Sequence, residues 1–236
     1  MSELSKSEPA IKQHYIQFYS ERDPEKVYPV EFVVRTLLGS YPHLKLDRSE
    51  FDGATILDLG FGDGRNMPLL HELGFEVYGV EISDEICRLT KRRMEKLGVP
   101  VHVKTGSNSH IPFADETFGF VLACHSCYYV NEGESFADNR REIARVLRTG
   151  GRFIFSLAKT DSYVLNDAVP LGKGLYRITQ DPYGLRNGNV FRAFASRKEI
   201  LKELGTGFCD LALGCCENDY YGIHEKVWIG TCLKKS

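Results

Sequence analysis

Residues 54–66 read Ala-Thr-Ile-Leu-Asp-Leu-Gly-Phe-Gly-Asp-Gly-Arg-Asn, and this stretch decides the fold of the chain. Residues 54–59 are an apolar run broken by one acid, which is typical of a buried parallel strand. Glycines follow at every second position, and residues 67–73 have helical character. Glycines at such a turn permit unusual dihedral angles and leave the backbone open to a ligand, and the helix start offers unpaired N–H groups. We therefore predict a strand, a ligand-binding turn and a helix.

The register of the glycines distinguishes two classes of ligand. Dinucleotide-binding turns follow the pattern G-x-G-x-x-G, in which the third glycine lets helix and strand pack closely. Here Arg65 stands at that third position, which argues against a pyrophosphate. Asp58 instead opens an acid-x-G-x-G-x-G pattern, which resembles the motif of the class I S-adenosylmethionine (SAM) methyltransferases. A carboxylate at the strand end suits the ammonium group of the methionine moiety. The alternative is a purely structural turn between strand and helix.

Two further segments extend this resemblance. Residues 75–81 predict a second strand that ends at Glu81. The resemblance implies that Glu81 accepts hydrogen bonds from the hydroxyls of the ribose. Residues 105–113 resemble the family's adenine-contacting segment, but Ser107 replaces the usual Asp, so the carboxylate contact is lost unless Asn108 supplies a carbonyl oxygen. The resemblance implies the following cofactor-binding residues: Asp58, Gly60, Phe61, Gly62, Gly64, Asn66, Glu81, Ile82, Ser107, Asn108, Ser109 and Cys124.

Residues 118–123 predict strand four, and ligands lie at the carboxyl ends of such strands. The following Cys-His-Ser-Cys-Tyr-Tyr-Val lacks the Asn or Asp-Pro-Pro-Tyr of methyltransferases that modify exocyclic amines, which argues against DNA-base or glutamine N-methylation. His125 is our candidate general base, because imidazole titrates near neutral pH. The alternative is a histidine that bonds the backbone and only shapes the pocket. Four tyrosines are candidate substrate-binding residues: Tyr15, Tyr19, Tyr128 and Tyr129.

The flanks of this core fit a single α/β domain of the same family. Residues 1–50 predict a helical cap with a break at Asp23-Pro24, and residues 51–157 form the SAM-binding core. Residues 158–194 are a substrate insertion with a predicted hairpin of 175–179 and 189–194. Its polar side chains Arg177, Tyr183, Arg186 and Arg192 are candidates for an anionic substrate group, although a surface role is favoured for each.

Residues 195–236 predict the final helix and a strand hairpin with a loop at 220–224. The predicted fold is therefore a seven-stranded, mostly parallel sheet with helices on both faces and an antiparallel last strand. This is the Rossmann-like fold that the resemblance implies. Oligomeric state stays open between monomer and homodimer.

Composition narrows the functional classes. The chain of 236 residues has a formal net charge of −2 and no dense basic run, which argues against a DNA partner. A cluster of charges at residues 91–96 is interpreted as a solvated helix face. No apolar stretch approaches the ~20 residues that span a bilayer, and the polar N-terminus favours a cytoplasmic protein.

Seven cysteines, several of them inside apolar runs, suggest reduced thiols. Residues 124–127 read Cys-His-Ser-Cys, and with Cys215 and Cys216 they would make only a weak zinc signal. We therefore predict no metal.

The sequence thus predicts a SAM-dependent methyltransferase that acts on an O or N atom of a small-molecule acceptor. The alternatives are a methyltransferase acting on protein or RNA, and a non-catalytic SAM-binding subunit. Aminopropyl transfer would need acids after strand four, which are absent from the Cys-His-Ser-Cys segment. An NAD-dependent enzyme is a more distant alternative. The sequence does not name the acceptor.

Overall fold

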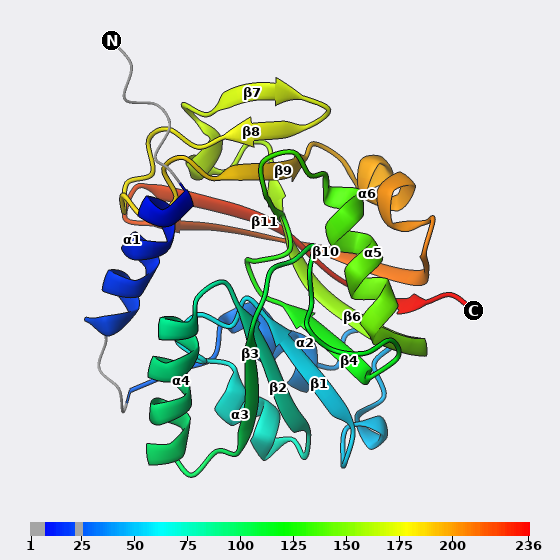
Figure 1. Cartoon of the computed structure of the whole chain (residues 1–236). Helices are drawn as coiled ribbons and strands as arrows, with labels where there is room; N and C mark the ends of the chain where they lie inside the picture. The colour runs from blue at the N-terminus through cyan, green and yellow to red at the C-terminus, as the bar shows by residue number, and fades with distance from the viewer. Residues whose placement is uncertain (1–7, 22–25) are drawn as a thin grey trace.

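A computed structural model describes residues 8–21 and 26–236 of the chain. The polar N-terminal residues 1–7 and the break predicted at Asp23-Pro24 lie outside these described ranges. Within them, a central sheet is covered by helices on both faces (Figure 1).

The main sheet has the predicted seven strands. Five are parallel in the order β3-β2-β1-β4-β6, β11 runs antiparallel to β6, and β10 runs antiparallel to β11. The last strand in the chain is therefore the reversed one, which confirms the predicted fold class. The strand bounds are β1 Thr55–Leu59, β2 Glu76–Glu81, β3 Val101–Thr105, β4 Phe118–Ala123, β6 Leu147–Lys159, β10 Phe208–Tyr220 and β11 Ile223–Lys234.

Each face of the sheet has its own apolar core. One core joins the sheet to α2, α3 and α4, with Leu37 and Met67 fully buried. The other joins it to α5 and α6, with Ile143 and Ile200 fully buried. Helix α1 lies against α4 at one edge (Figure 1). The helix bounds are α1 Glu8–Ser20, α2 Glu31–Leu38, α3 Met67–Glu72, α4 Asp84–Lys96, α5 Phe136–Val146 and α6 Arg197–Leu204, with 3-10 turns at Arg48–Glu50 and Tyr163–Leu165.

The predicted hairpin of the insertion is formed. Strand β8 pairs antiparallel with β9, and β9 also joins the end of β6 through Ala158 and Lys159. Two short strands that we did not predict complete this appended sheet: β7 pairs with β8, and β5 pairs with β9. Because β5 pairs with β9, the insertion is attached directly to the segment after β4. The bounds are β5 Tyr129–Val130, β7 Val169–Gly172, β8 Leu175–Arg177 and β9 Val190–Phe194.

The prediction of a loop at residues 220–224 was wrong, because the structure has a two-residue turn there. Strands β10 and β11 extend to Tyr220 and Ile223, and only Tyr221 and Gly222 form the turn, both with positive φ. His224 is therefore a strand residue opposite Asp219, with 3.6 Å between its Nε2 and the carboxylate. The extension over residues 214–219 was not predicted from the sequence. A hairpin with both faces exposed to solvent lacks the alternation of apolar and polar residues that marks a half-buried strand.

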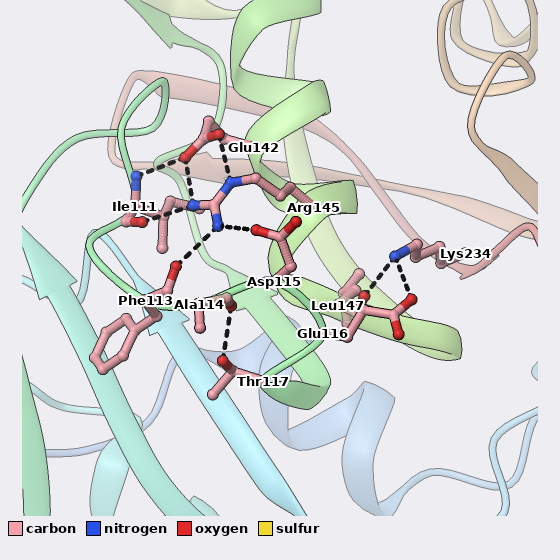
Figure 2. Close-up of polar contacts among 10 residues, drawn as sticks. All are labelled: Ile111, Phe113, Ala114, Asp115, Glu116, Thr117, Glu142, Arg145, Leu147 and Lys234. Atoms are coloured by element: carbon pink, nitrogen blue, oxygen red, sulfur yellow. Dashed lines mark hydrogen bonds and ion pairs between the residues drawn. The ribbon is translucent and has the colours of Figure 1, made fainter.

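A cluster of hydrogen bonds on α5 fixes the loop that follows β3 (Figure 2). The guanidinium of Arg145 donates to the backbone oxygens of Ile111 at 2.8 Å and Phe113 at 2.9 Å, and to the carboxylate of Asp115 at 2.7 Å. Glu142 accepts from Arg145 and from the N–H of Ile111. This loop also carries residues 107–109, so α5 determines where they lie.

We expect Arg145→Met to lower the free energy of unfolding by about 3 kcal/mol, because it removes several charge-assisted hydrogen bonds and leaves two loop carbonyls without partners. Urea unfolding measures the change. Arg141→Met on the same helix is the control, because the Arg141 side chain is 71% exposed and its pair with Asp138 lies in solvent. Equal costs for both variants would contradict a structural role for the Arg145 cluster.

Candidate active site

The glycine turn between β1 and α3 has no room for side chains. Gly60, Gly62 and Gly64 all have positive φ, between 57° and 73°. An added Cβ would collide with Ser126 at Gly60, with the Tyr19 hydroxyl at Gly62 and with Thr90 at Gly64. Helix α1, helix α4 and the segment after β4 therefore converge on this turn, and its backbone forms one wall of the site.

Helix α4 holds the turn through its own side chains. Thr90 Oγ1 donates to the carbonyl oxygen of Gly62 at 2.8 Å, and Arg93 Nη1 donates to that of Asp63 at 2.7 Å. Arg93 is buried, so the prediction of a solvated face at residues 91–96 was wrong at this position. Arg93 shares a helix face with Ile86 and Thr90, which are also buried, and that helical phase is the signal that sequence reasoning missed.

Two carboxylates lie near the ends of adjacent strands beside the turn. Asp58 of β1 is fully buried, and neither of its oxygens has a hydrogen-bond partner among the described residues. Burial raises the pKa of this carboxyl to about 8, and the nearby charges of Glu81 and Asp63 add to the effect. An unpaired carboxylate in such a place is costly unless a ligand completes it. The position therefore suits a ligand with a cationic or donor group.

Glu81 ends β2 and faces a cleft of about 500 Å³. Its Oε2 accepts the N–H of Ile82 at 2.5 Å. Burial raises the pKa of Glu81 to about 7, although hydrogen bonds from the N–H groups of Ile82 and Gly62 act against this. The cleft brings together five of the predicted cofactor residues: Gly60, Glu81, Ile82, Ser107 and Asn108. Asp58 at the end of β1, and Gly62 and Gly64 of the glycine turn, lie beside it.

Asn108 has its amide nitrogen committed to the backbone. The Nδ2 group donates to the carbonyl oxygens of Ser126 at 2.8 Å and Tyr129 at 3.1 Å. The side-chain oxygen is therefore the atom that remains for a ligand in the cleft. Ser107 Oγ lies 3.2 Å from Ser109 Oγ, so these two hydroxyls bond each other at the rim. Ser109 does not line the cleft itself.

A smaller cavity of about 230 Å³ adjoins the cleft and shares one wall with it. The shared wall consists of Tyr15, Tyr19, Gly60, His125 and Tyr129. Further lining residues include three from the predicted cofactor set, namely Phe61, Asn66 and Cys124, and the aromatic residues Tyr128, Tyr163 and Phe191. The four predicted substrate tyrosines therefore all line this cavity.

His125 lies on the shared wall in a strained backbone conformation, with φ of 54°. Its N–H donates to Ser156 Oγ at 2.8 Å, and its ring meets that of Phe32 edge-on. Burial lowers the pKa of His125 to about 4, and the charge of Arg186 lowers it further. The imidazole is therefore neutral at physiological pH and free to accept a proton, although its low pKa makes it a weak base.

The tyrosines connect the cap to the core. Tyr15 of α1 donates its hydroxyl to that of Tyr129 at 3.0 Å, and Tyr128 stacks on Tyr129. Tyr19 covers Gly62. Burial raises the pKa of the Tyr15 and Tyr129 hydroxyls, so both are neutral phenols. Asn66 also binds the cap, because its Oδ1 accepts the N–H of Val30 at 3.1 Å.

The stability of the ligand-free protein is expected to fall as pH rises. In the folded protein, burial raises the pKa of Asp58 to about 8 and that of Glu81 to about 7, so both carboxyls stay protonated up to those pH values. In the unfolded chain the same carboxyls lose their protons near pH 4. In that window the folded state binds more protons, so the free energy of unfolding decreases with pH. We expect Asp58→Asn to stabilise the protein by about 3 kcal/mol at pH 8.5 and much less at pH 5. Urea unfolding of both proteins at the two pH values measures the change. A variant no more stable than wild type at pH 8.5 would contradict this expectation.

Neither a metal centre nor a disulfide is found in residues 8–21 and 26–236. No group of three or more His, Cys, Asp or Glu side chains there is placed to hold a metal ion, and the seven cysteines are free thiols. Of the helices in the same ranges, none is both long and apolar enough to cross a bilayer.

Comparison with known proteins identifies the core. Residues 57–155 match the family model described as a methyltransferase domain. A protein-L-isoaspartate O-methyltransferase from Gloeobacter violaceus is 39% identical over 67 residues, which cover 26% of this chain and 33% of that protein. A ubiquinone biosynthesis O-methyltransferase from Paramagnetospirillum magneticum is 30% identical over 104 residues, which cover 44% and 40%. The chain thus spans about a third to two fifths of the length of these curated relatives.

The fold is similar over a greater length. The crystal structure of the PH0226 protein from Pyrococcus horikoshii matches with a TM-score of 0.66 at 20% identity, covering 93% of this chain and 99% of that one. Residues 57–155 therefore carry a methyltransferase domain, and the sheet order and the glycine turn of the structure agree with that match. S-adenosylmethionine is accordingly the expected cofactor.

Proposed function

We propose that this protein transfers a methyl group from SAM to an oxygen or nitrogen atom of a small-molecule acceptor. The observation that carries the proposal is the buried carboxylate of Asp58, which has no partner in the described residues and lies beside a turn that admits no Cβ. A ligand with a cationic group and a close backbone approach fits both features. The methionine end of SAM has that chemistry.

The cleft residues fit the remainder of the cofactor. Glu81 accepts hydrogen bonds from the two ribose hydroxyls, and the free side-chain oxygen of Asn108 accepts one from the adenine amino group. Ile82 and Ser107 line the adenosine end, and Gly60 and Gly62 present backbone to the methionine end. Asn108 thereby takes over the contact that is lost with the usual Asp at position 107.

The smaller cavity holds the acceptor. Bound SAM supplies a methyl group that its sulfonium already activates, so the chain has to align the acceptor and exclude water. Tyr15 and Tyr19 from α1 close the cavity above, and Tyr128 and Tyr129 form its aromatic side. Neutral His125 on the shared wall accepts the proton of an acceptor hydroxyl. The small volume and the aromatic lining of the cavity support a small acceptor over a protein or RNA, and two of the curated relatives are named as ubiquinone biosynthesis O-methyltransferases.

The cofactor assignment has a direct binding test. Calorimetric titration with S-adenosylhomocysteine is expected to show binding at one site, and a tenfold excess of NAD is expected to leave that titration unchanged. Displacement by NAD would contradict the assignment. Binding without any methyl transfer would instead favour a non-catalytic SAM-binding subunit.

His125→Gln is expected to lower the turnover number for a hydroxyl acceptor by about 100-fold while leaving S-adenosylhomocysteine binding unchanged, because the amide fills similar space but cannot take up a proton. Initial rates of methyl transfer and calorimetry measure the two effects. Unchanged turnover with intact cofactor binding would show that the imidazole only shapes the pocket.

A further inference from the structure

The smaller cavity contains two charged side chains whose arrangement defines a chemical class of acceptor. Of its Asp, Glu, Lys and Arg lining residues, Asp63 and Arg65 pair with each other at 2.8 Å, and Lys226 pairs with Asp161 at 3.0 Å. The remaining two are Arg186 and Glu225. Among the described residues no ion pair joins them; burial raises the pKa of the Glu225 carboxyl, and the charge of Arg186 offsets part of that rise.

Arg186 is held rigidly by the insertion. Its Nη1 lies 3.1 Å from Oδ1 of Asp181 and 3.3 Å from the Tyr163 hydroxyl. Asp181 is fully buried behind the cavity wall and also accepts the N–H groups of Leu185 and Arg186, at 3.0 Å each. The side chain of Arg186 is 26% exposed, and its guanidinium also forms a hydrogen bond with the Tyr129 side chain. The expectation of a surface role for Arg186 was therefore wrong.

This arrangement presents a fixed cation to the cavity. Asp181 cannot turn toward a ligand, because its oxygens are engaged by the loop, so the accessible part of the pair is positive. A guanidinium presents several donors in one plane and binds carboxylates in two-point fashion. An acceptor with a carboxylate fits beside Arg186.

Glu225 supplies the opposite charge from β11. It lines the cavity, and no hydrogen bond or ion pair to its carboxylate is found in the described part of the chain. Burial raises the pKa of this carboxyl, and a cation beside it would reverse that shift. The aromatic faces of Tyr128 and Tyr163 lie in the same cavity, and aromatic faces favour cations.

The cavity wall that lies beside the two charges suits a flat body. Tyr128 and Tyr129 stack at 5.3 Å, and Phe191 packs on both rings, so one side of the cavity is aromatic. We infer that, if the cavity is the acceptor site proposed above, it selects a small aromatic zwitterion of the amino-acid type, with its carboxylate on Arg186 and its ammonium group on Glu225.

Three probes that differ only in charge test this inference. L-tyrosine carries both charges, tyramine lacks the carboxylate, and 3-(4-hydroxyphenyl)propionate lacks the ammonium group. Each is titrated calorimetrically into the protein saturated with S-adenosylhomocysteine. We expect L-tyrosine to bind at least 10-fold tighter than either analogue. Arg186→Met is expected to reduce L-tyrosine affinity to that of tyramine for wild type, and Glu225→Gln to that of the propionate.

Arg192→Met is the control, because Arg192 lies in the same insertion with its guanidinium over Phe194 and does not line the cavity. It is expected to leave all three affinities unchanged. Equal binding of the three probes, or binding of none of them, would overturn the zwitterion inference while S-adenosylhomocysteine still binds. Failure of S-adenosylhomocysteine to bind would instead overturn the proposed function.

Discussion

Replacing Glu81 with glutamine is expected to weaken the binding of S-adenosylhomocysteine about 100-fold. The carboxylate accepts from both ribose hydroxyls in the proposed complex, and an amide presents one oxygen and an NH₂ group that cannot accept. Losing one of these hydrogen bonds, and the charge that strengthens the other, is worth about 3 kcal/mol, which corresponds to that factor. Calorimetry measures the change. The variant should fold, because burial raises the pKa of Glu81 to about 7 and a neutral side chain is tolerated there.

Glu76→Gln is the matched control for this prediction. Glu76 begins the same strand, but its side chain is half exposed and lies away from the cleft, near His102. We expect its substitution to change cofactor affinity less than twofold. A similar loss in both variants, or full affinity in Glu81→Gln, would mean that Glu81 does not bind the ribose.

Gly60→Ala is expected to lower the free energy of unfolding by about 3 kcal/mol or more and to abolish cofactor binding. The residue has φ of 71°, and its new Cβ would collide with the side chain of buried Ser126. Left-handed backbone costs an alanine about 1–2 kcal/mol, and the collision adds to that. Ser126 has little freedom to move, because its hydroxyl bonds the carbonyl of Leu59.

Gly53→Ala separates the two causes, since Gly53 has the same φ of 71° and nothing within 4 Å of a new Cβ. It should cost about 1 kcal/mol in urea unfolding and leave binding intact. If both alanine variants unfold at the same urea concentration, close packing at the glycine turn plays no part in stability.

Local patterns were sufficient to predict the core elements. Strand β4 has the bounds that its apolar run predicted, and Ser83 and Ser196 cap the helices that follow them by accepting backbone N–H groups. These features depend on neighbours in the chain, which a sequence shows directly. The pairing of β8 with β9 was also predicted, because its two strands are close in sequence.

The burial of two arginines was not predicted from local patterns. Arg93 and Arg186 each looked like a surface arginine, because residues from other segments cover them, although Arg186 also pairs with Asp181 of its own segment. Asp63 binds Arg93 from the glycine turn, and the tyrosines around Arg186 come from the segment after β4 and from a 3-10 turn. Short strands such as β5 and β7 were also missed, since two to four residues carry no readable period.

In the candidate site, too, the residues that belong to local motifs were predicted, and the contributions of distant segments were not. Asp58 and Glu81 follow from the motif and the strand end, and the structure places both beside the glycine turn. The division into a cleft and a smaller cavity depends on where α1 and the insertion lie. No sequence pattern indicated that Cys124 and Asn66 would line the smaller cavity, or that Glu225 of the final hairpin would reach it.

Transfer of label from methyl-labelled SAM into a cell extract tests the proposed activity most directly. The extract is separated after the reaction into small molecules and macromolecules, and Glu81→Gln serves as the inactive control. We predict label in the small-molecule fraction with the wild-type protein and little with the variant. Label in protein or RNA would contradict a small-molecule acceptor. An absence of label in both fractions, with S-adenosylhomocysteine still bound, would contradict catalysis itself.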